Sequence, residues 1–199
     1  MYVTNDVDGT IGTVEMLLAV RAVLGGRHPN WGTRNALLSL GPKTYLEIMG
    51  PDPSLPRPHE PRPFGMDTIP KPRLATWVAR ADDIKSVPDR ARRQGLDLGE
   101  IQERSRTKPD GSILTWTVTD LSKSRMDGII PYFINWGASQ HPAQGSPTGC
   151  RLMKLLLFHP DATRANELFR ALGIDILVEP GPPALKATIE SPNGRVVLE

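Results

Sequence analysis

The sequence predicts an α+β fold in which one unit, a strand followed by a helix and three more strands, occurs three times. Three observations predict this fold. Apolar residues repeat at helical spacing after short apolar segments, apolar and polar residues alternate along later segments, and glycine or proline separates the segments. We expect these βαβββ modules to form a curved antiparallel or mixed sheet with a central cleft, because the helices would pack on the outside.

Residues 1–51 are expected to form the first module. Residues 2–4 read as a short strand, and the polar residues 5–8 can cap a helix. The helix is predicted by apolar residues at helical spacing, namely Val7, Ile11, Val14 and Leu18. Gly25 and Gly26 are then expected to break the chain. Extended segments should follow at 27–28, 33–40 and 44–49, with Gly41-Pro42 as a turn signal between the last two.

Residues 52–73 are expected to form a linker arm. Proline occurs throughout this stretch, and it can continue neither a helix nor a central strand. The arm should therefore be extended and cross the surface.

Residues 74–150 are expected to form the second module. A strand is predicted at 74–80, followed by a helix that contains Ile84, Val87 and Ala91. Pro88 is compatible with the first turn of this helix, and Gly95 is a C-terminal stop signal. Further strands are predicted at 101–106, 113–119 and 130–136.

Residues 151–199 are expected to form a third, smaller module. It begins with an apolar strand at 152–158, and Asp161 can cap the helix that follows. That helix should end at Gly173, and strands are predicted at 176–178, 184–190 and 195–198.

Composition limits the classes of partner and compartment. The 24 basic and 22 acidic residues leave a formal charge of +2, which gives no electrostatic case for nucleic acid. A single cysteine, Cys150, excludes an intramolecular disulfide and suits a reducing compartment. No apolar stretch approaches the roughly 20 residues that span a bilayer, and the first residues lack the basic segment and apolar run that are typical of a secretory signal. We expect a cytoplasmic protein whose partner is a small molecule, not nucleic acid or membrane.

A carboxylate among apolar neighbours marks a candidate site on the first module. Side chains alternate between the two faces of a strand, so Tyr45, Glu47 and Met49 share one face. The same alternation places Thr33 and Asn35 together on the preceding strand. A hydroxyl, an amide and a carboxylate are therefore expected to converge on one concave surface that binds a small molecule.

Several blocks of sequence together resemble a known superfamily. They are GGRHPNWGTRNALLSLG with YLEIMGPDP, PRLATWVARADDI, PYFINWGASQHPAQGSPTGC and LGIDILVEPGPPALKATIESPNGRVVL. With them the chain resembles the vicinal oxygen chelate superfamily, and within it the glyoxalase-like domain group. The resemblance covers nearly the whole chain and implies paired βαβββ modules in one compact domain. Modules of this superfamily often pair between subunits, so the resemblance allows a homodimer.

The resemblance also raises the question of a metal, because enzymes of this superfamily commonly hold a divalent ion through His and Glu from both modules. Glu47 matches the carboxylate near the end of the first module, and the histidine that often begins this module would precede Met1. The corresponding positions of the second module fall near Thr76 and at Asn135. Tight divalent binding needs three or four good donors. We therefore expect no cofactor, with Glu47 a metal ligand only if upstream residues supply the others.

Candidate site residues follow from these observations. Glu47 and His28 are the candidate catalytic residues, with Glu47 as base and His28 as general acid or base. The candidate substrate-binding residues are Thr33, Asn35, Asn135, His141 and Trp77. Asn135 is expected to face the cleft with Phe133, opposite Ile134 and Trp136. The competing interpretation is that each imidazole bonds a nearby backbone carbonyl and that the tryptophans are core residues.

Three functions remain open at this point. The first is binding of a small organic molecule with lyase, isomerase or hydrolase-type chemistry at a carbonyl. The second is binding or sequestration without chemistry. The third is a structural domain whose cleft is filled by Trp and Leu side chains. The sequence does not decide whether the protein is an enzyme.

Overall fold

The computed structural model describes residues 1–107, 111–122 and 125–199 and confirms the α+β class. Over these residues it contains the helices α1 (Val7–Leu18), α2 (Val87–Arg92) and α3 (Ala162–Leu172) together with thirteen strands in three sheets. The sheets are mixed, since each contains both parallel and antiparallel pairs. None of the described helices is long and apolar enough to cross a membrane.

The first sheet has the strand order β2-β3-β4-β1-β5. Its strands are β1 (Tyr2–Val3), β2 (Val23–His28), β3 (Thr33–Gly41), β4 (Thr44–Pro51) and β5 (Arg73–Leu74). Helix α1 packs on this sheet, and the apolar residues that predicted the helix are all buried. The expected break at Gly25-Gly26 is wrong, because β2 runs through both glycines with a register shift between Leu24 and Gly26.

The second sheet has the order β6-β9-β8-β7. Its strands are β6 (Val78–Arg80), β7 (Ile101–Thr107), β8 (Ile113–Thr119) and β9 (Tyr132–Asn135). The parallel pair β6–β9 corresponds to the parallel pair β1–β4, so the first two sheets share one strand order. Helix α2 is shorter than expected, because a 3-10 turn at Ile84–Ser86 precedes it.

The strand expected at 74–80 is divided between two sheets. Strand β5 pairs with β1, and β6, which begins after three intervening residues, pairs with β9. Two hydrogen bonds fix the segment between β5 and β6. The Ala75 amide donates to the Met1 carbonyl (3.1 Å), and the Thr76 hydroxyl donates to the Gly128 carbonyl (3.2 Å). These long-range bonds, which alternation along the chain does not reveal, explain the difference.

The third sheet has the order β11-β10-β12-β13. Its strands are β10 (Arg151–His159), β11 (Val178–Pro180), β12 (Ala184–Ser191) and β13 (Gly194–Leu198). Here the first strand lies between the second and third, so this unit repeats the succession of elements but not their pairing. Strand β11 begins at Val178, later than expected, at the residue whose amide and carbonyl both bond the Asn166 side chain of α3 (2.9 Å each).

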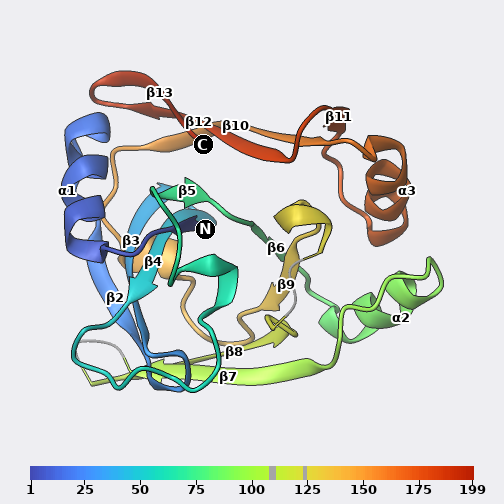
Figure 1. The fold of residues 1–199 in the computed structure, drawn as a ribbon, viewed down its shortest axis with the longest axis horizontal. Helices are drawn as coiled ribbons and strands as arrows, with labels where there is room; N and C mark the ends of the chain where they lie inside the picture. Colours follow the sequence, from blue (N-terminus) through green and yellow to red (C-terminus); the bar gives the residue numbers. More distant parts are fainter. Residues whose placement is uncertain (108–110, 123–124) are drawn as a thin grey trace.

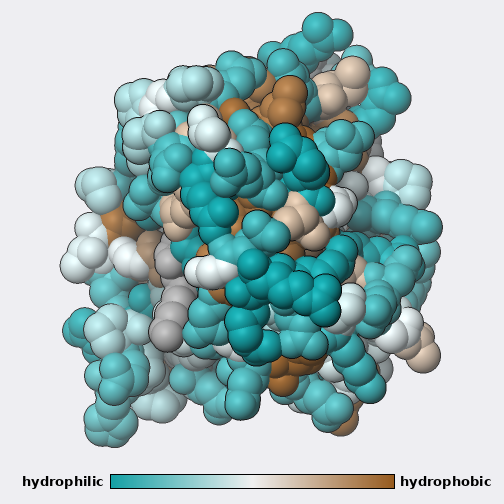
Figure 2. Space-filling view, turned by 90° about the vertical axis from the view of Figure 1, so that its right-hand side faces the viewer, coloured by the Kyte–Doolittle hydropathy of each residue, from teal (hydrophilic) through white to brown (hydrophobic). Residues whose placement is uncertain are grey.

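The three sheets surround a common interior, with the helices at the periphery (Figure 1). The third sheet crosses one side of the molecule, with α1 and α3 near its two ends, and the main hydrophobic core includes residues of all three sheets. The face that carries α2 and α3 is mostly hydrophilic, with small separate hydrophobic patches (Figure 2).

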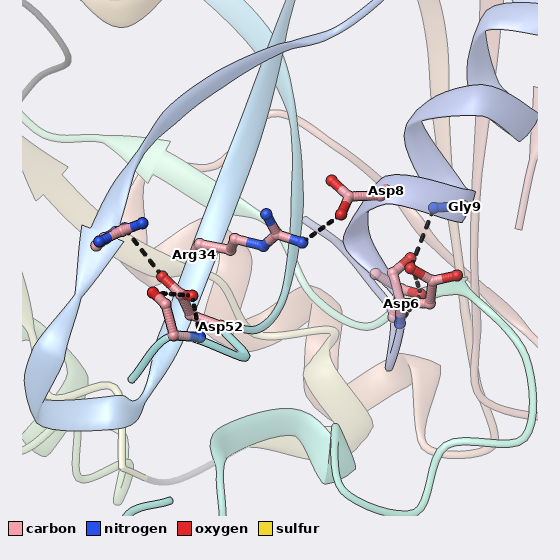
Figure 3. A network of polar contacts seen from close by, with 8 residues as sticks. Asp6, Asp8, Gly9, Arg34 and Asp52 are labelled. Atoms are coloured by element: carbon pink, nitrogen blue, oxygen red, sulfur yellow. Dashed lines mark hydrogen bonds and ion pairs between the residues drawn. The ribbon is translucent and has the colours of Figure 1, made fainter. Parts of the chain in front are cut away.

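Residues 52–73 contain a 3-10 turn at Pro63–Gly65 but no α-helix or long strand. They are anchored to the first sheet, because the Arg62 side chain donates to the Gly32 carbonyl (3.1 Å) and pairs with Asp67 (2.6 Å), and Met66 is fully buried. Asp52, where this arm begins, pairs with Arg27 of β2 (3.1 Å). Nearby, Arg34 of β3 reaches Asp8 at the start of α1 (Figure 3).

Candidate functional site

A cavity of about 230 Å³ lies between the first and second sheets. The first sheet and the turn after β2 contribute His28, Trp31, Asn35, Tyr45 and Glu47. The second sheet contributes Arg104, Arg106 and Trp116, and Trp136 follows its strand β9. We call this space the first cavity. It combines a charged and polar wall with an aromatic wall.

A chain of hydrogen bonds forms the polar wall. The Arg106 guanidinium donates through Nη1 to Asn35 Oδ1 (3.1 Å), and Asn35 donates through Nδ2 to Glu47 Oε1 (2.6 Å). Asn35 is 3% exposed and Arg106 is 8% exposed, whereas Glu47 is partly open to the cavity. The second sheet therefore fixes the Asn35 amide, and this amide orients the carboxylate.

Strand register explains why Asn35 and Glu47 meet. In the β3–β4 pair, Asn35 lies opposite Met49 and Glu47 lies opposite Leu37. The two residues are thus diagonal neighbours on one face, within reach of long side chains. The convergence of these two groups, which the sequence predicted, is present in the structure. The Thr33 hydroxyl, which was expected to join them, does not line the first cavity.

Arg106 reaches this pair because the residue of β2 at the point of contact, Gly25, has no side chain. A Cβ atom at Gly25 would lie 2.5 Å from Arg106 Nη1 and 2.6 Å from Asn35 Oδ1, closer than real Cβ atoms approach such groups. Gly25 therefore provides the space for the Arg106–Asn35 bond. The sequence did not identify Gly25 or Arg106 as site residues. Arginines at the alternate positions 104 and 106 of a predicted strand nevertheless indicated a basic face.

His28 lies at the rim of the first cavity. Its Nδ1 lies 3.1 Å from the Thr33 hydroxyl, its partner in the β2–β3 register. Burial lowers the pKa of His28 below its ordinary value of 6.5, although the nearby Glu47 carboxylate opposes this shift. The imidazole is therefore neutral near pH 7. Thr33 is fully buried and serves to orient this ring.

Aromatic side chains form the opposite wall. The rings of Trp116 and Trp136 lie 5.5 Å apart between centroids, and Tyr45 contacts Trp136 edge-on at 6.5 Å. Trp31 also borders the cavity, and the guanidinium carbon of Arg104 lies over its ring, 5.4 Å from the ring centroid. Flat surfaces of this kind suit a planar or apolar ligand group.

The structure does not bring Asn135 to the first cavity. Ile134 and Trp136, its neighbours in the sequence, line the cavity instead, so the expected facing of this segment is reversed. The Asn135 amide donates to the carbonyls of Ala81 (3.0 Å) and Asp82 (2.7 Å) and accepts from the Gly137 amide (2.7 Å). These bonds fix the end of β9, so the Asn135 side chain has a structural role.

Trp77 and His141 also lie outside the first cavity. Both line a second cavity, of about 300 Å³, beneath the third sheet. The Trp77 indole donates to the Ile129 carbonyl (2.8 Å), and the His141 Nδ1 accepts from the Ala143 amide (3.2 Å). His28 and His141 therefore do not close over one cavity.

The side chains present do not fit a divalent metal. Within the three described segments, no three His, Cys, Asp or Glu side chains gather in a group that could hold an ion. Glu47 Oε1 already accepts the Asn35 amide, and the Thr76 hydroxyl is directed to a backbone carbonyl. One carboxylate beside an amide is a poor donor set for a metal that prefers three or four protein ligands.

Comparison with known proteins defines the relationship of this chain to others. A crystal structure of a hypothetical protein from Staphylococcus aureus superposes with a TM-score of 0.66 at 11% identity, covering 92% of this chain and 85% of that chain, which shows a shared fold. A search of curated proteins found no match. The family model described as "Glyoxalase-like domain" matches residues 1–173. The chain therefore belongs to the glyoxalase-like domain family, within the vicinal oxygen chelate superfamily.

Proposed function

We propose that the first cavity binds a small organic molecule that carries a carbonyl or hydroxyl group and a flat apolar part. The observation that carries this proposal is the Arg106–Asn35–Glu47 chain of hydrogen bonds facing an aromatic wall in one cavity. Such a combination of convergent polar groups and apolar surface is typical of ligand sites.

The polar groups have complementary roles. Asn35 holds Oε1 of Glu47, and we assign the other carboxylate oxygen, Oε2, to the ligand. A ligand hydroxyl, or a C–H next to a carbonyl, would deliver its proton to this oxygen. Arg104 and Arg106 supply positive charge on the same wall, which stabilises negative charge that develops on the ligand carbonyl. This arrangement supports lyase or isomerase chemistry without a metal.

The alternative is binding or sequestration without chemistry in the same cavity. An unreactive site would use Glu47 only as a hydrogen-bond acceptor, and the ligand would return unchanged. The purely structural hypothesis predicted a filled cleft, and the open space beside Glu47 argues against it. A cytoplasmic location and a homodimer stay part of the proposal, the first because the single cysteine suits a reducing compartment.

The test is a panel of small aromatic aldehydes, ketones and hydroxy acids, with binding measured by tryptophan fluorescence. Three tryptophans line the first cavity, so a bound ring should change their emission. Glu47→Gln should weaken the best ligand about tenfold or more, because a charge-assisted hydrogen bond is lost. Glu179→Gln, at an exposed position on β11, is the matched control.

Two further readouts complete this test. Mass spectrometry of the ligand after incubation separates the enzyme from the binder, since only turnover that Glu47→Gln abolishes supports catalysis. Excess EDTA should leave the affinity of the wild type unchanged. Loss of binding in EDTA, or equal binding by wild type and Glu47→Gln, would contradict the proposal.

A further inference from the structure

The second cavity has a different chemical character from the first. One wall of the second cavity is the inner face of the third sheet. On this face Leu185 and Ala187 are alternate residues of β12, and Ala187 pairs with Leu155 of β10. Leu74, Trp77 and Leu152 continue the apolar surface. The small Ala187 side chain among leucines leaves space that a larger residue would fill.

The two cavities share part of their wall but differ in most of their polar groups. Asn35, Arg104 and Arg106 border only the first, and the residues that border both are Met1, Tyr45, Glu47, Val78, Ile134 and Trp136. Glu47 is the one acidic side chain among the residues that line the second cavity. Met1 also lines this cavity, but burial lowers the pKa of its amino group to about 6, so this group offsets the charge of Glu47 little. An anionic ligand group is therefore disfavoured beside Glu47.

Positive charge gathers elsewhere along the wall of the second cavity. Lys43 and Arg80 line it together with His141 and are exposed to solvent. Burial lowers the pKa of His141, and the charges of Arg80 and Lys43 lower it further. Arg80 pairs with Asp82 (2.6 Å). Lys43 forms no ion pair with any residue that the structure describes. A cation thus stands at the solvent-exposed edge of an apolar space.

We infer that the second cavity is a binding site for a linear alkyl carboxylate, with the chain beneath the third sheet and the carboxylate beside Lys43. The apolar lining accepts the chain, the exposed Lys43 attracts the carboxylate, and the half-buried Glu47 repels it, so one orientation is favoured. This site shares Glu47 with the site of the proposed function, but the inference concerns a different ligand and does not depend on that function.

The volume sets the length of the chain. A water molecule occupies about 30 Å³ of liquid and a methylene group is of similar size. The cavity of about 300 Å³ therefore suits a chain of about eight to ten carbons. Shorter chains leave it partly empty, and longer chains must extend into solvent.

The experiment is calorimetric titration of the full chain with hexanoate, octanoate, decanoate and 1-octanol. Each added methylene should strengthen binding about fourfold, so octanoate should bind about 15-fold more tightly than hexanoate. The gain should level off beyond about ten carbons, because the cavity is then full. Octanol, which keeps the chain and lacks the charge, separates the two halves of the site.

Variants test each half. Lys43→Gln should weaken octanoate about threefold and leave octanol unchanged, because only the exposed charge is removed. Lys154→Gln, an exposed lysine on β10 outside the cavity, is the control. Ala187→Leu should weaken both ligands about tenfold or more, because it occupies the space of the chain. If this variant proves unstable, Leu155→Ala serves instead and should shift the preferred ligand toward longer chains.

The outcomes separate this inference from the proposed function. Absence of octanoate binding, affinity independent of chain length, or unchanged binding by the Ala187 and Leu155 variants would overturn it. Asn35 borders the first cavity and not the second, so Asn35→Leu changes the lining of the first cavity directly. If it abolishes octanoate binding while Ala187→Leu does not, the chain lies in the first cavity, and the inference fails while the proposed function stands.

Discussion

Asn35 is the residue that connects the two sheets at the first cavity. It accepts from Arg106 of β7 and donates to Glu47 of β4, and it is almost completely buried. Alternation along two strands was sufficient to predict that Asn35 and Glu47 share a face. Arg106 could not be assigned in the same way, because its contact depends on how one sheet packs against another.

Replacing Asn35 tests this link. Asn35→Leu leaves the buried Arg106 group and Glu47 Oε1 without their partner, so the free energy of unfolding should fall by about 1–3 kcal/mol. Urea denaturation measures this change. Asn30→Ala, at an exposed position on the rim, should stay within about 0.5 kcal/mol of wild type. An equally stable Asn35→Leu variant would show that the bonds contribute little.

His28 makes stability depend on pH. Burial holds the pKa of His28 in the folded protein below 6.5, so the unfolded chain binds more protons as the pH falls from about 6.5 toward the folded pKa. The free energy of unfolding should therefore decrease over this range and be unaffected by His28 at higher pH. His141, whose pKa burial also lowers, acts in the same direction.

The measurement is urea denaturation between pH 7.5 and 5 at intervals of about half a unit, spanning the ordinary histidine range. His28→Gln should reduce the loss of stability on acidification. His59→Gln removes an exposed imidazole in the arm and is the control for histidine removal. An unchanged pH dependence in His28→Gln would contradict the assignment.

At the scale of elements, helices α1 and α3 were well predicted because their signals are local. Apolar spacing fixed the buried face of α1, and Asp161 and Gly173 bound α3 as expected. The sequence did not predict that β2 continues through its glycine pair, because glycine ordinarily interrupts a strand. Gly25 occurs here because a larger residue would clash with Arg106, which is distant in the sequence. The facing of β9 was also missed, since its register depends on β8 and β6.

The start of α1 offers a test of local stabilisation. The Asp6 carboxylate accepts from the Gly9 amide (3.1 Å) as the N-cap of the helix (Figure 3). Asp6→Ala should lower the free energy of unfolding by about 1 kcal/mol. Asp6→Asn keeps a capping oxygen and should retain most of the stability. Equal losses in both variants would assign the effect to the charge instead of the cap.

The glycine of β2 links an element to the site. Gly25→Ala places a methyl group against Arg106 and Asn35, so it should weaken the best ligand of the first cavity and destabilise the fold. Gly12→Ala in α1 meets no atom within 4 Å and should stabilise the protein by about 0.5–1 kcal/mol. Ligand titration and thermal unfolding of the two variants provide the comparison. Normal ligand affinity in Gly25→Ala would contradict the proposed role of this glycine.

At the scale of the whole molecule, the sequence indicated three similar units, and the structure distinguishes them. The first and second sheets share one strand order, whereas the third sheet, with β10 between β11 and β12, does not. Local sequence patterns determine the order of helices and strands along the chain. Which strands pair with each other depends instead on contacts between residues that are distant in the sequence. The cleft was predicted as one space, and the third sheet creates a second beside it.

The most direct test of the central claim is a crystal structure of the protein with the tightest-binding compound of the aromatic carbonyl panel. We expect the ring of the compound beside Trp31, Trp116 or Trp136 and its oxygen within hydrogen-bond distance of Glu47 or Arg106. A compound located outside the first cavity, or one that makes no contact with Glu47, Asn35 or Arg106, would contradict the account.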